Sequence, residues 1–121
     1  MSISWQGSVV FFGTRDLEAV DRFYRQCLGL PLFKDQGLCR IYDVPGGGRV
    51  GFCTHLTAAP LKKSPIITLL AQDVDQAYEQ LIECGYQPDT EPKVHDNFHI
   101  YHFFVQDPSG YTLEIQRFLD D

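Results

Sequence analysis

The side chains with the clearest potential for chemistry lie near the C-terminal end of the chain: His95, His99, His102 and Glu114. Imidazole can donate or accept a proton near neutral pH, and a neighbouring carboxylate can orient it for general acid–base catalysis. The same two groups also bind divalent metals. The question is whether the fold brings any of these side chains together.

Glu114 lies in the segment YTLEIQ, which follows a turn of the composition DPSG (107–110) and alternates as a β-strand does. Tyr111, Leu113 and Ile115 fall on one face, so Glu114 points to the other. A single glutamate on such a strand is exposed to solvent by default. Glu114 is therefore a site residue only if the rest of the fold covers its face.

The three histidines do not form a metal motif in the sequence. His99 and His102 point to opposite faces of a strand, because their separation is odd. His95 and His99 would share a face but stand about 13 Å apart at the rise of a strand. We also expect His95 to lie in a loop.

Composition excludes several classes of function. The chain has 121 residues, which predicts a single domain over residues 1–121, and its net charge is −6. Its ten basic residues are scattered, with only Lys62 and Lys63 adjacent, so neither a nucleic acid nor a membrane surface is expected as a partner. The apolar runs, such as IITLLA (66–71), are too short to span a bilayer.

The N-terminal residues show no secretion signal, and the four cysteines contain no closely spaced pair typical of a redox or zinc motif. We expect Cys27 and Cys84 to be buried on helices. These features predict a reduced, cytoplasmic protein. His55 ends a predicted strand and is expected at its rim.

The sequence repeats one pattern twice. A strand over 8–14 precedes a helix within the segment 15–30, with Asp16 as N-cap and Gly29 as its stop, and two strands follow over 37–44 and 48–55. The second half places a strand at 65–72, a helix from Asp73 to Gly85, and strands at 98–105 and 111–118. We interpret this as an internal duplication, with module one at about residues 8–60 and module two at about residues 65–118.

Each module has a sheet with one helix to cover it, which leaves one sheet face bare. Two such modules can place their bare faces around a central trough, with the helices outside. This arrangement turns Glu114 into the trough. Alternation predicts which strand residues pack under the helices: Val10, Phe12, Ile67 and Leu69. It predicts that others face the trough: Val9, Phe11, Ile66, Thr68 and Leu70.

The segments RDLEAVDRFYRQCLGL (15–30) and QDPSGYTLEIQ (106–116) carry a resemblance that extends over nearly the whole chain. They resemble the vicinal oxygen chelate superfamily, which includes glyoxalase I, bleomycin-resistance proteins and extradiol dioxygenases. The resemblance implies an α+β fold in which paired βαβββ modules form a curved mixed sheet around a central cavity, with the helices outside.

The resemblance also implies where metal ligands would lie. In metal-using members, the first strand of each module supplies a histidine and the last strand a glutamate. The matching positions here are Val9, Ile66, Phe52 and Glu114, of which only Glu114 can bind a metal. One carboxylate does not make a tight transition-metal site. We therefore predict no cofactor, and a divalent metal (Ni, Zn, Mn or Fe) is disfavoured.

The position of His102 depends on the register of its strand. A simple four-residue turn would set Phe103 opposite Glu114, whereas the superfamily's pattern implies a shift of one, which turns His102 and Phe104 inward. We favour the shifted register. His102 would then either serve acid–base chemistry with Glu114 or only satisfy the hydrogen bonds of both buried groups.

The leading functional hypothesis is a small-molecule-binding protein of this superfamily that lacks most of the usual metal ligands. Glu114 and His102 would orient the ligand, and they are also the candidate catalytic pair. The remaining predicted ligand-binding residues are Val9, Phe11, Phe52, Ile66, Thr68 and Phe104.

The alternative is a lyase, isomerase or dioxygenase of the same superfamily that uses a divalent metal or a His–Glu acid–base pair. A third hypothesis is a non-catalytic interaction module whose trough is filled by its own side chains. A homodimer is common in the superfamily and is the expected assembly.

Overall fold

The computed structural model describes residues 4–60 and 65–120, so the Lys62–Lys63 pair lies outside the described residues. The chain divides into two compact units, residues 1–59 and 60–121, which we call module one and module two and describe separately. The expectation that their bare faces meet in one trough stays a prediction.

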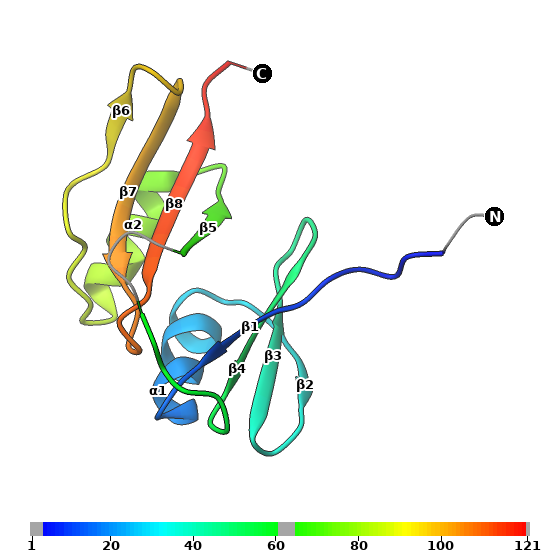
Figure 1. Ribbon diagram of the computed structural model, residues 1–121. Coiled ribbons are helices and arrows are strands. Elements are labelled where there is room, and N and C mark those ends of the chain that lie inside the picture. The colour runs from blue at the N-terminus through cyan, green and yellow to red at the C-terminus, as the bar shows by residue number, and fades with distance from the viewer. Residues whose placement is uncertain (1–3, 61–64, 121) are drawn as a thin grey trace. The chain divides into compact units, whose positions relative to one another are not determined.

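Module one contains β1 (Val10–Gly13), a helix in two parts, α1 (Leu17–Asp21) and η1 (Arg22–Cys27), and then β2 (Leu32–Asp35), β3 (Cys39–Asp43) and β4 (Arg49–Cys53). Its four-stranded sheet has the order β1-β4-β3-β2 (Figure 1). β1 pairs with β4 in parallel, and the other pairs are antiparallel.

Module two contains β5 (Ile66–Leu70), α2 (Val74–Glu83), β6 (Lys93–His95), β7 (Ile100–Gln106) and β8 (Thr112–Phe118). Its sheet has the order β5-β8-β7-β6, with β5 parallel to β8. The two mixed sheets confirm the α+β class and the two βαβββ modules predicted from the sequence. No helix among the described residues is long and apolar enough to cross a membrane.

The helix ends follow the predicted caps. Asp16 accepts a hydrogen bond from Ala19 N, and Asp73 accepts one from Gln76 N, both at 3.0 Å. Gly29 and Gly85 adopt positive φ angles of 77° and 95° just after the helices, which glycine tolerates without steric cost. These local signals positioned both helices correctly.

The first helix forms as predicted, but its second part, η1, is a π-helix in which Leu28 N donates to Phe23 O, five residues back, at 3.0 Å. One prediction about an element was wrong. His95 does not lie in a loop, because it ends β6, a three-residue strand that pairs with β7. Both β6 and β2 escaped the sequence analysis because short edge strands show little alternation.

The core of module one is aromatic. Tyr24 stacks on Phe52 at a ring-centroid distance of 4.9 Å, and Tyr42 contacts the same ring edge-on at 6.5 Å. Phe52 is completely buried. It was expected to face a cavity, and that expectation was wrong, because Phe52 lies on the sheet face that packs against the helix. Val10, expected under the helix, is 58% exposed at the start of β1.

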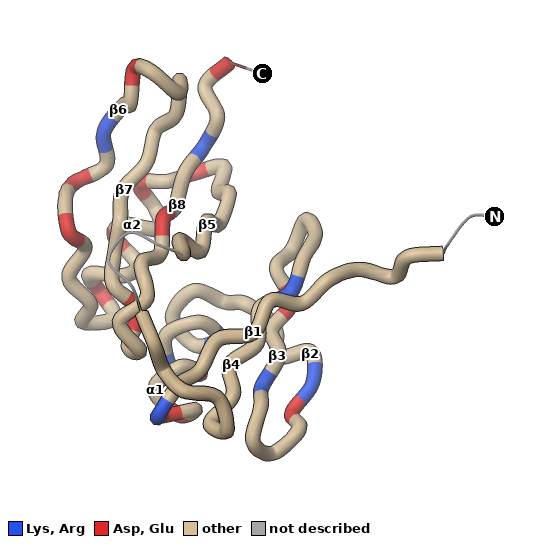
Figure 2. The backbone as a smooth tube through the Cα atoms, in the orientation of Figure 1, with Lys and Arg blue, Asp and Glu red and all other residues tan. Residues whose placement is uncertain are grey.

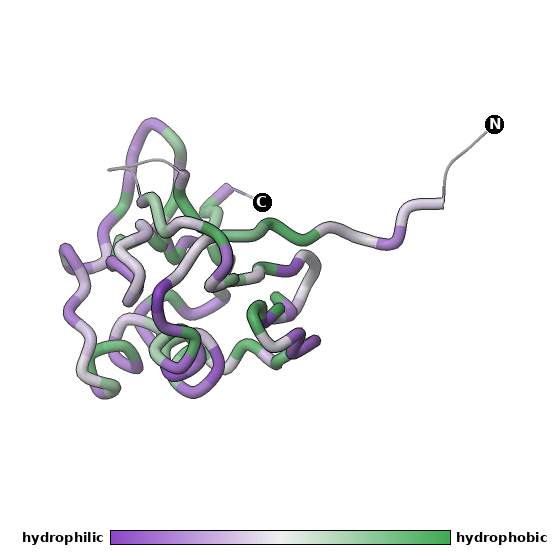
Figure 3. Tube along the Cα trace, turned by 60° about the horizontal axis from the view of Figure 1, so that its bottom comes forward, coloured by the Kyte–Doolittle hydropathy of each residue, from purple (hydrophilic) through white to green (hydrophobic). Residues whose placement is uncertain are grey.

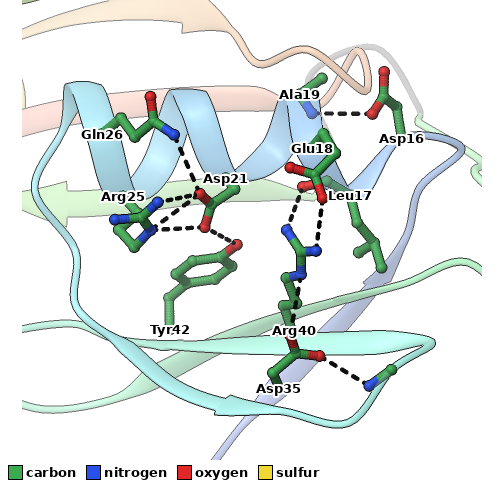
Figure 4. A network of polar contacts seen from close by, with 11 residues as sticks. Asp16, Leu17, Glu18, Ala19, Asp21, Arg25, Gln26, Asp35, Arg40 and Tyr42 are labelled. Atoms are coloured by element: carbon green, nitrogen blue, oxygen red, sulfur yellow. Dashed lines mark hydrogen bonds and ion pairs between the residues drawn. The ribbon is translucent and has the colours of Figure 1, made fainter.

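A polar network crosses the same interface (Figure 4). Arg25 and the Tyr42 hydroxyl both donate to the buried carboxylate of Asp21, at distances down to 2.6 Å and at 3.0 Å. Hydrogen bonding by Arg25 lowers the pKa of Asp21, while burial raises the pKa of Tyr42. Arg40 ties β3 to the start of α1 by donating to Glu18 at 2.7 Å.

The core of module two is apolar by comparison. Val74 and Leu81 of α2 are buried, as are Leu113 and Ile115 of β8. Tyr78 packs edge-on against Phe103, at 5.3 Å between ring centroids. The face of β8 opposite to Glu114 is therefore the one that packs under the helix.

The cysteines differ from expectation. Cys39 and Cys53, distant in sequence, lie opposite each other on β3 and β4 and form a disulfide. Cys27 is buried as predicted, whereas Cys84 is exposed at the end of α2. The absence of closely spaced cysteines in the sequence did not exclude a disulfide, because antiparallel pairing of β3 and β4 brings the sulfurs of Cys39 and Cys53 together.

Candidate functional site

The loop between β7 and β8 sets the register of the site. Asp107 Oδ1 accepts hydrogen bonds from Ser109 N and Tyr111 N, both at 2.9 Å. Gln106 pairs with Thr112 across this loop, so the connection has five residues rather than four. The extra residue places Phe104 opposite Glu114 and His102 opposite Gln116, which confirms the shifted register.

His102 and Glu114 consequently share a face and meet. His102 Nδ1 lies 2.7 Å from Glu114 Oε2, and the two residues are 4% and 8% exposed. A carboxylate only accepts hydrogen bonds, so Nδ1 donates and carries the proton. Thr68 Oγ1 donates to the other oxygen, Oε1, at 3.0 Å, and Gln116 Nε2 adds a longer contact at 3.4 Å. Both carboxylate oxygens of Glu114 therefore accept a hydrogen bond within the protein.

The second nitrogen of His102 is different. Nε2 is buried and has no hydrogen-bond partner within residues 4–60 and 65–120. A buried polar atom without a partner costs about 1–3 kcal/mol, so native structures rarely retain one. With Nδ1 protonated, Nε2 of a neutral imidazole is an acceptor that a donor group could satisfy.

This pair lies at a pocket of about 690 Å³ that module two forms by itself. That volume is within the range of small-molecule sites. Apolar and aromatic side chains make up much of its wall, with a few polar groups among them. The lining residues are Ile66, Asp89, His95, Phe98, Ile100, His102, Phe104, Thr112, Glu114, Gln116 and Phe118.

His95 lines the pocket, although the sequence analysis expected it in a loop and did not include it among the ligand-binding residues. Its ring lies 5.8 Å from that of His102 and 4.7 Å from that of Phe98. Pairing of Lys93 with His102 puts β6 beside β7 and turns His95 to the pocket side. The only sequence signal for this strand was the alternation of polar and apolar residues over Lys93–His95. Three residues are too few to distinguish a strand from the loop around it.

The other predicted site residues divide between the modules. Ile66 and Phe104 line the pocket, and Thr68 acts through its bond to Glu114. Val9 and Phe11 belong to module one, where Val9 is half-buried before β1 and Phe11 is 45% exposed. Their predicted role in ligand binding stays a prediction.

Strand register corrects which residue of module one matches Glu114. Thr68 pairs with Glu114 in module two, and Phe11, which lies 57 residues before Thr68, pairs with Gly51 in module one. The counterpart of Glu114 is therefore Gly51, not Phe52. A Cβ at Gly51 would stand 2.6 Å from the Phe11 ring, so any side chain at this position requires that ring to move.

The residues at the superfamily's metal positions do not fit a metal. Val9, Ile66 and Gly51 offer no ligand atom, and Glu114 is engaged by His102 and Thr68. Three or more protein ligands are usual for a transition metal. We therefore derive no chemistry from a metal at these positions.

The two modules carry different charge. Residues 65–120 contain ten Asp and Glu against two Lys and Arg, a net charge of 2 − 10 = −8. Residues 4–60 contain five acidic and six basic residues, a net charge of +1. Figure 2 shows this difference along the backbone. Two carboxylates, Asp89 and Glu114, line the pocket, and none of its described lining residues is Lys or Arg.

Comparison with known proteins agrees with this architecture. Residues 7–115 match the family model of the Glyoxalase/Bleomycin resistance protein/Dioxygenase superfamily. No protein with a curated description matches the chain.

Solved structures with the same fold include a glyoxalase/bleomycin resistance protein/dioxygenase from Alicyclobacillus acidocaldarius, with a TM-score of 0.77 and 18% identity over 96% of this chain and 93% of that one. A glyoxalase/bleomycin resistance protein/dioxygenase family enzyme from Burkholderia phytofirmans PsJN has a TM-score of 0.77 and 22% identity, over 93% and 98% of the two chains. A third, from Nocardioides, has a TM-score of 0.72 and 19% identity, over 99% and 87%.

Identities this low support the fold alone, whereas the family match covers most of the chain. The predicted resemblance is thus confirmed, and the chain belongs to the glyoxalase/bleomycin resistance protein/dioxygenase superfamily.

Proposed function

We propose that this protein binds a small molecule in the pocket of module two, and that the ligand is an organic cation with an aromatic or apolar body. The observation that carries the proposal is the buried His102–Glu114 pair at the wall of a largely apolar pocket. A few placed polar groups in an apolar cavity are typical of ligand sites, because the polar groups set orientation and the apolar walls supply binding energy.

The walls favour a flat or apolar ligand body. Phe98, Phe104 and Phe118 line the pocket, and Phe98 and Phe118 are more than half exposed at 68% and 51%. Exposed aromatic rings gain free energy when a ligand covers them, at about 25 cal/mol per Å² of apolar surface removed from water. Aromatic faces also attract cations directly.

Charge favours a cation over an anion. Module two has a net charge of −8 over residues 65–120, and the fixed charges of the pocket are the carboxylates of Asp89 and Glu114. Such a field concentrates cations and repels anions. A ligand that shifts the neighbouring rings and offers an N–H group to His102 Nε2 would also satisfy that unpartnered nitrogen.

An acid–base enzyme is a second candidate, favoured by one specific feature. Glu114 holds the proton of His102 on Nδ1, and this leaves Nε2 as a base, the arrangement that orients catalytic histidines in many enzymes. On this alternative, His102 would take a proton from the bound compound, without a metal. It predicts turnover, which a binding protein lacks.

The test compares matched probes in buffer containing EDTA. Phenethylamine, an aromatic cation at neutral pH, is titrated beside phenylacetate, an aromatic anion of similar size, by calorimetry and thermal denaturation. We expect binding and a rise in Tm with the amine only. Equal binding of the two probes, or binding of neither, would refute the proposed ligand class.

Glu114→Gln then locates the site, with Glu79→Gln on the exposed face of α2 as the control for the loss of one charge. We expect Glu114→Gln to weaken amine binding by about 10-fold, equivalent to about 1.4 kcal/mol, and Glu79→Gln to leave it unchanged. Equal effects of the two substitutions would show that bulk charge, not the pocket, binds the amine. Time-resolved NMR of the bound compound tests the enzyme alternative, because any turnover should disappear in His102→Asn.

A further inference from the structure

A second group of reactive side chains lies in module one, on the sheet face away from its helix. Phe52 faces the helix, and residues alternate along β4, so Cys53 faces the opposite way. Cys39 stands directly across from Cys53 on β3, at a Cα–Cα distance of 4.1 Å. The two cysteines are the cross-strand pair that forms the disulfide.

The ladder around this pair brings the two side chains close. Thr54 N donates to Leu38 O at 2.8 Å, so Leu38 and Thr54 stand at a hydrogen-bonded position of the ladder, although Leu38 N donates to Gln36 O instead of to Thr54 O. Paired positions alternate along antiparallel strands, so the neighbouring cysteines form a non-hydrogen-bonded pair, where side chains approach most closely. The backbone therefore holds the two sulfurs together whether or not they are bonded to each other.

His55 completes a cluster. It lies in the turn just after β4, and its Nδ1 is 3.6 Å from Cys39 Sγ. The ligand atoms of Cys39, Cys53 and His55 all lie within 4.8 Å of one another. In a tetrahedral zinc site, ligand atoms at about 2.0–2.3 Å from the metal stand about 3.3–3.8 Å apart, and the 3.6 Å between Cys39 Sγ and His55 Nδ1 already matches that spacing. The cluster is therefore already close to the dimensions of a metal site.

The three residues of the cluster differ in their exposure to solvent. Cys53 and Cys39 are 1% and 8% exposed, while His55 is exposed. The chain after β4 folds back over Gly13, where the Thr57 carbonyl fills the space that a Cβ would need. Gly13 pairs with Cys53, so this segment lies on the sheet face that carries the two cysteines. An ion would enter from the side of His55.

Two thiolates and one imidazole are a donor set that suits thiophilic divalent cations, above all Zn²⁺. Among the described residues, this is the single group of three His, Cys, Asp or Glu side chains with ligand atoms in mutual reach. We propose that Cys39, Cys53 and His55 form a binding site for Zn²⁺ or a similar soft cation when the disulfide is reduced, and that the disulfide closes this site.

The two thiols release two protons when they bind Zn²⁺ as thiolates, and His55 binds as a neutral imidazole. A low-molecular-weight disulfide can then oxidise the pair: the thiolates give up two electrons, the Cys39–Cys53 bond forms and Zn²⁺ leaves, while the S–S bond of the oxidant breaks and its two sulfurs take up these electrons and two protons from water to become thiols. The site would thus hold metal in a reducing environment and release it in an oxidising one.

The experiment uses the full chain with Cys84→Ser as the background, because Cys84 is an exposed thiol that could bind metal by itself. Oxidised and reduced protein, both freed of reductant by gel filtration, are titrated with Zn²⁺ against a chromophoric chelator. Co²⁺ serves as a second probe, since thiolate ligation gives a charge-transfer band in the near ultraviolet. We expect one Zn²⁺ per reduced chain and none per oxidised chain.

Variants separate the three ligands. His55→Ala changes an exposed residue and should weaken Zn²⁺ binding by about 10-fold or more, whereas Cys39→Ser and Cys53→Ser should each remove the Co²⁺ charge-transfer intensity of one thiolate. Equal binding by oxidised and reduced chains would overturn the proposal. So would binding that persists in the Cys39→Ser, Cys53→Ser double variant, or a His55→Ala variant with unchanged affinity.

Discussion

The two modules use the same backbone plan and place different chemistry on it. Strand registers match Gly51 of module one to Glu114 of module two, and they also match Cys39 to His102. In module one, Phe11 lies over Gly51 and the cysteines pair with each other. In module two, the equivalent positions hold a His–Glu pair beside a pocket.

On the sheet faces that pack against the helices, module one is the more polar of the two modules. Module one buries Asp21 and Tyr42 between its helix and sheet, where the Asp21 carboxylate also accepts from the exposed Arg25. Module two packs Tyr78 against Phe103 at the corresponding place. In module one, the buried polar side chains lie on the sheet face under the helix. In module two, they lie on the opposite sheet face, beside the pocket.

The largest expected effect tests which face is core. Phe52→Ala removes a completely buried ring that packs on Tyr24, so it should lower the free energy of unfolding by about 3–5 kcal/mol. Phe104→Ala, on the pocket face of module two, should cost less because that ring is partly exposed. Urea denaturation followed by circular dichroism measures both, and equal losses would contradict the assignment of the faces.

The polar network of module one gives the next effect. Asp21→Asn weakens the bond to Arg25 and should cost about 1.5–3 kcal/mol at neutral pH. The folded-state pKa of Asp21 is lowered, first by the Arg25 hydrogen bond. Its contribution to stability is therefore present above the unfolded-state pKa of about 3.9 and is lost as the pH falls through the lower folded value.

Urea titrations at a series of pH values below neutral measure this loss. The wild-type protein should lose more stability than Asp21→Asn as the pH falls below about 4. Asp96→Asn, a substitution of an exposed aspartate in module two, is the control. Parallel curves for Asp21→Asn and the wild type would show that the network does not shift the titration of Asp21.

A third substitution transfers the pocket position of module two into module one. Gly51→Glu places a side chain where the Phe11 ring lies, so it should destabilise the protein by about 1–3 kcal/mol. Adding Phe11→Thr recreates the Thr68–Glu114 pair and should recover part of this loss. Thermal denaturation of the single and double variants checks it, and strictly additive losses would mean that the two positions do not interact.

The smallest effects should be the same in both modules. Asp16 and Asp73 cap their helices with matching 3.0 Å hydrogen bonds, so Asp16→Ala and Asp73→Ala should each cost about 1 kcal/mol. Chemical denaturation of the two variants gives the comparison. A much larger cost in one module would show that its cap does more than satisfy the helix end.

The sequence by itself determined the features that depend on neighbouring residues. Asp16 and Asp73 mark helix starts, because a short acceptor side chain satisfies the free N–H groups of the first turn. Apolar periodicity predicted both helices and most strands, and the continuous hydrophobic stretch of β1 stands out near the N-terminal trace in Figure 3. The duplication followed from the order of these elements, and the family resemblance followed from the segments 15–30 and 106–116.

Tertiary structure decided what depends on pairing between distant segments. A one-residue difference in the length of the β7–β8 loop moves every side chain of β7 to the other face. The hydrogen bonds of Asp107, which the sequence alone did not reveal, hold that loop at five residues. Pairing also brings Cys39 to Cys53, turns His95 to the pocket and matches Gly51, not Phe52, to Glu114. Such contacts depend on strand register, and alternation within a single strand carries no information about the register of its partner.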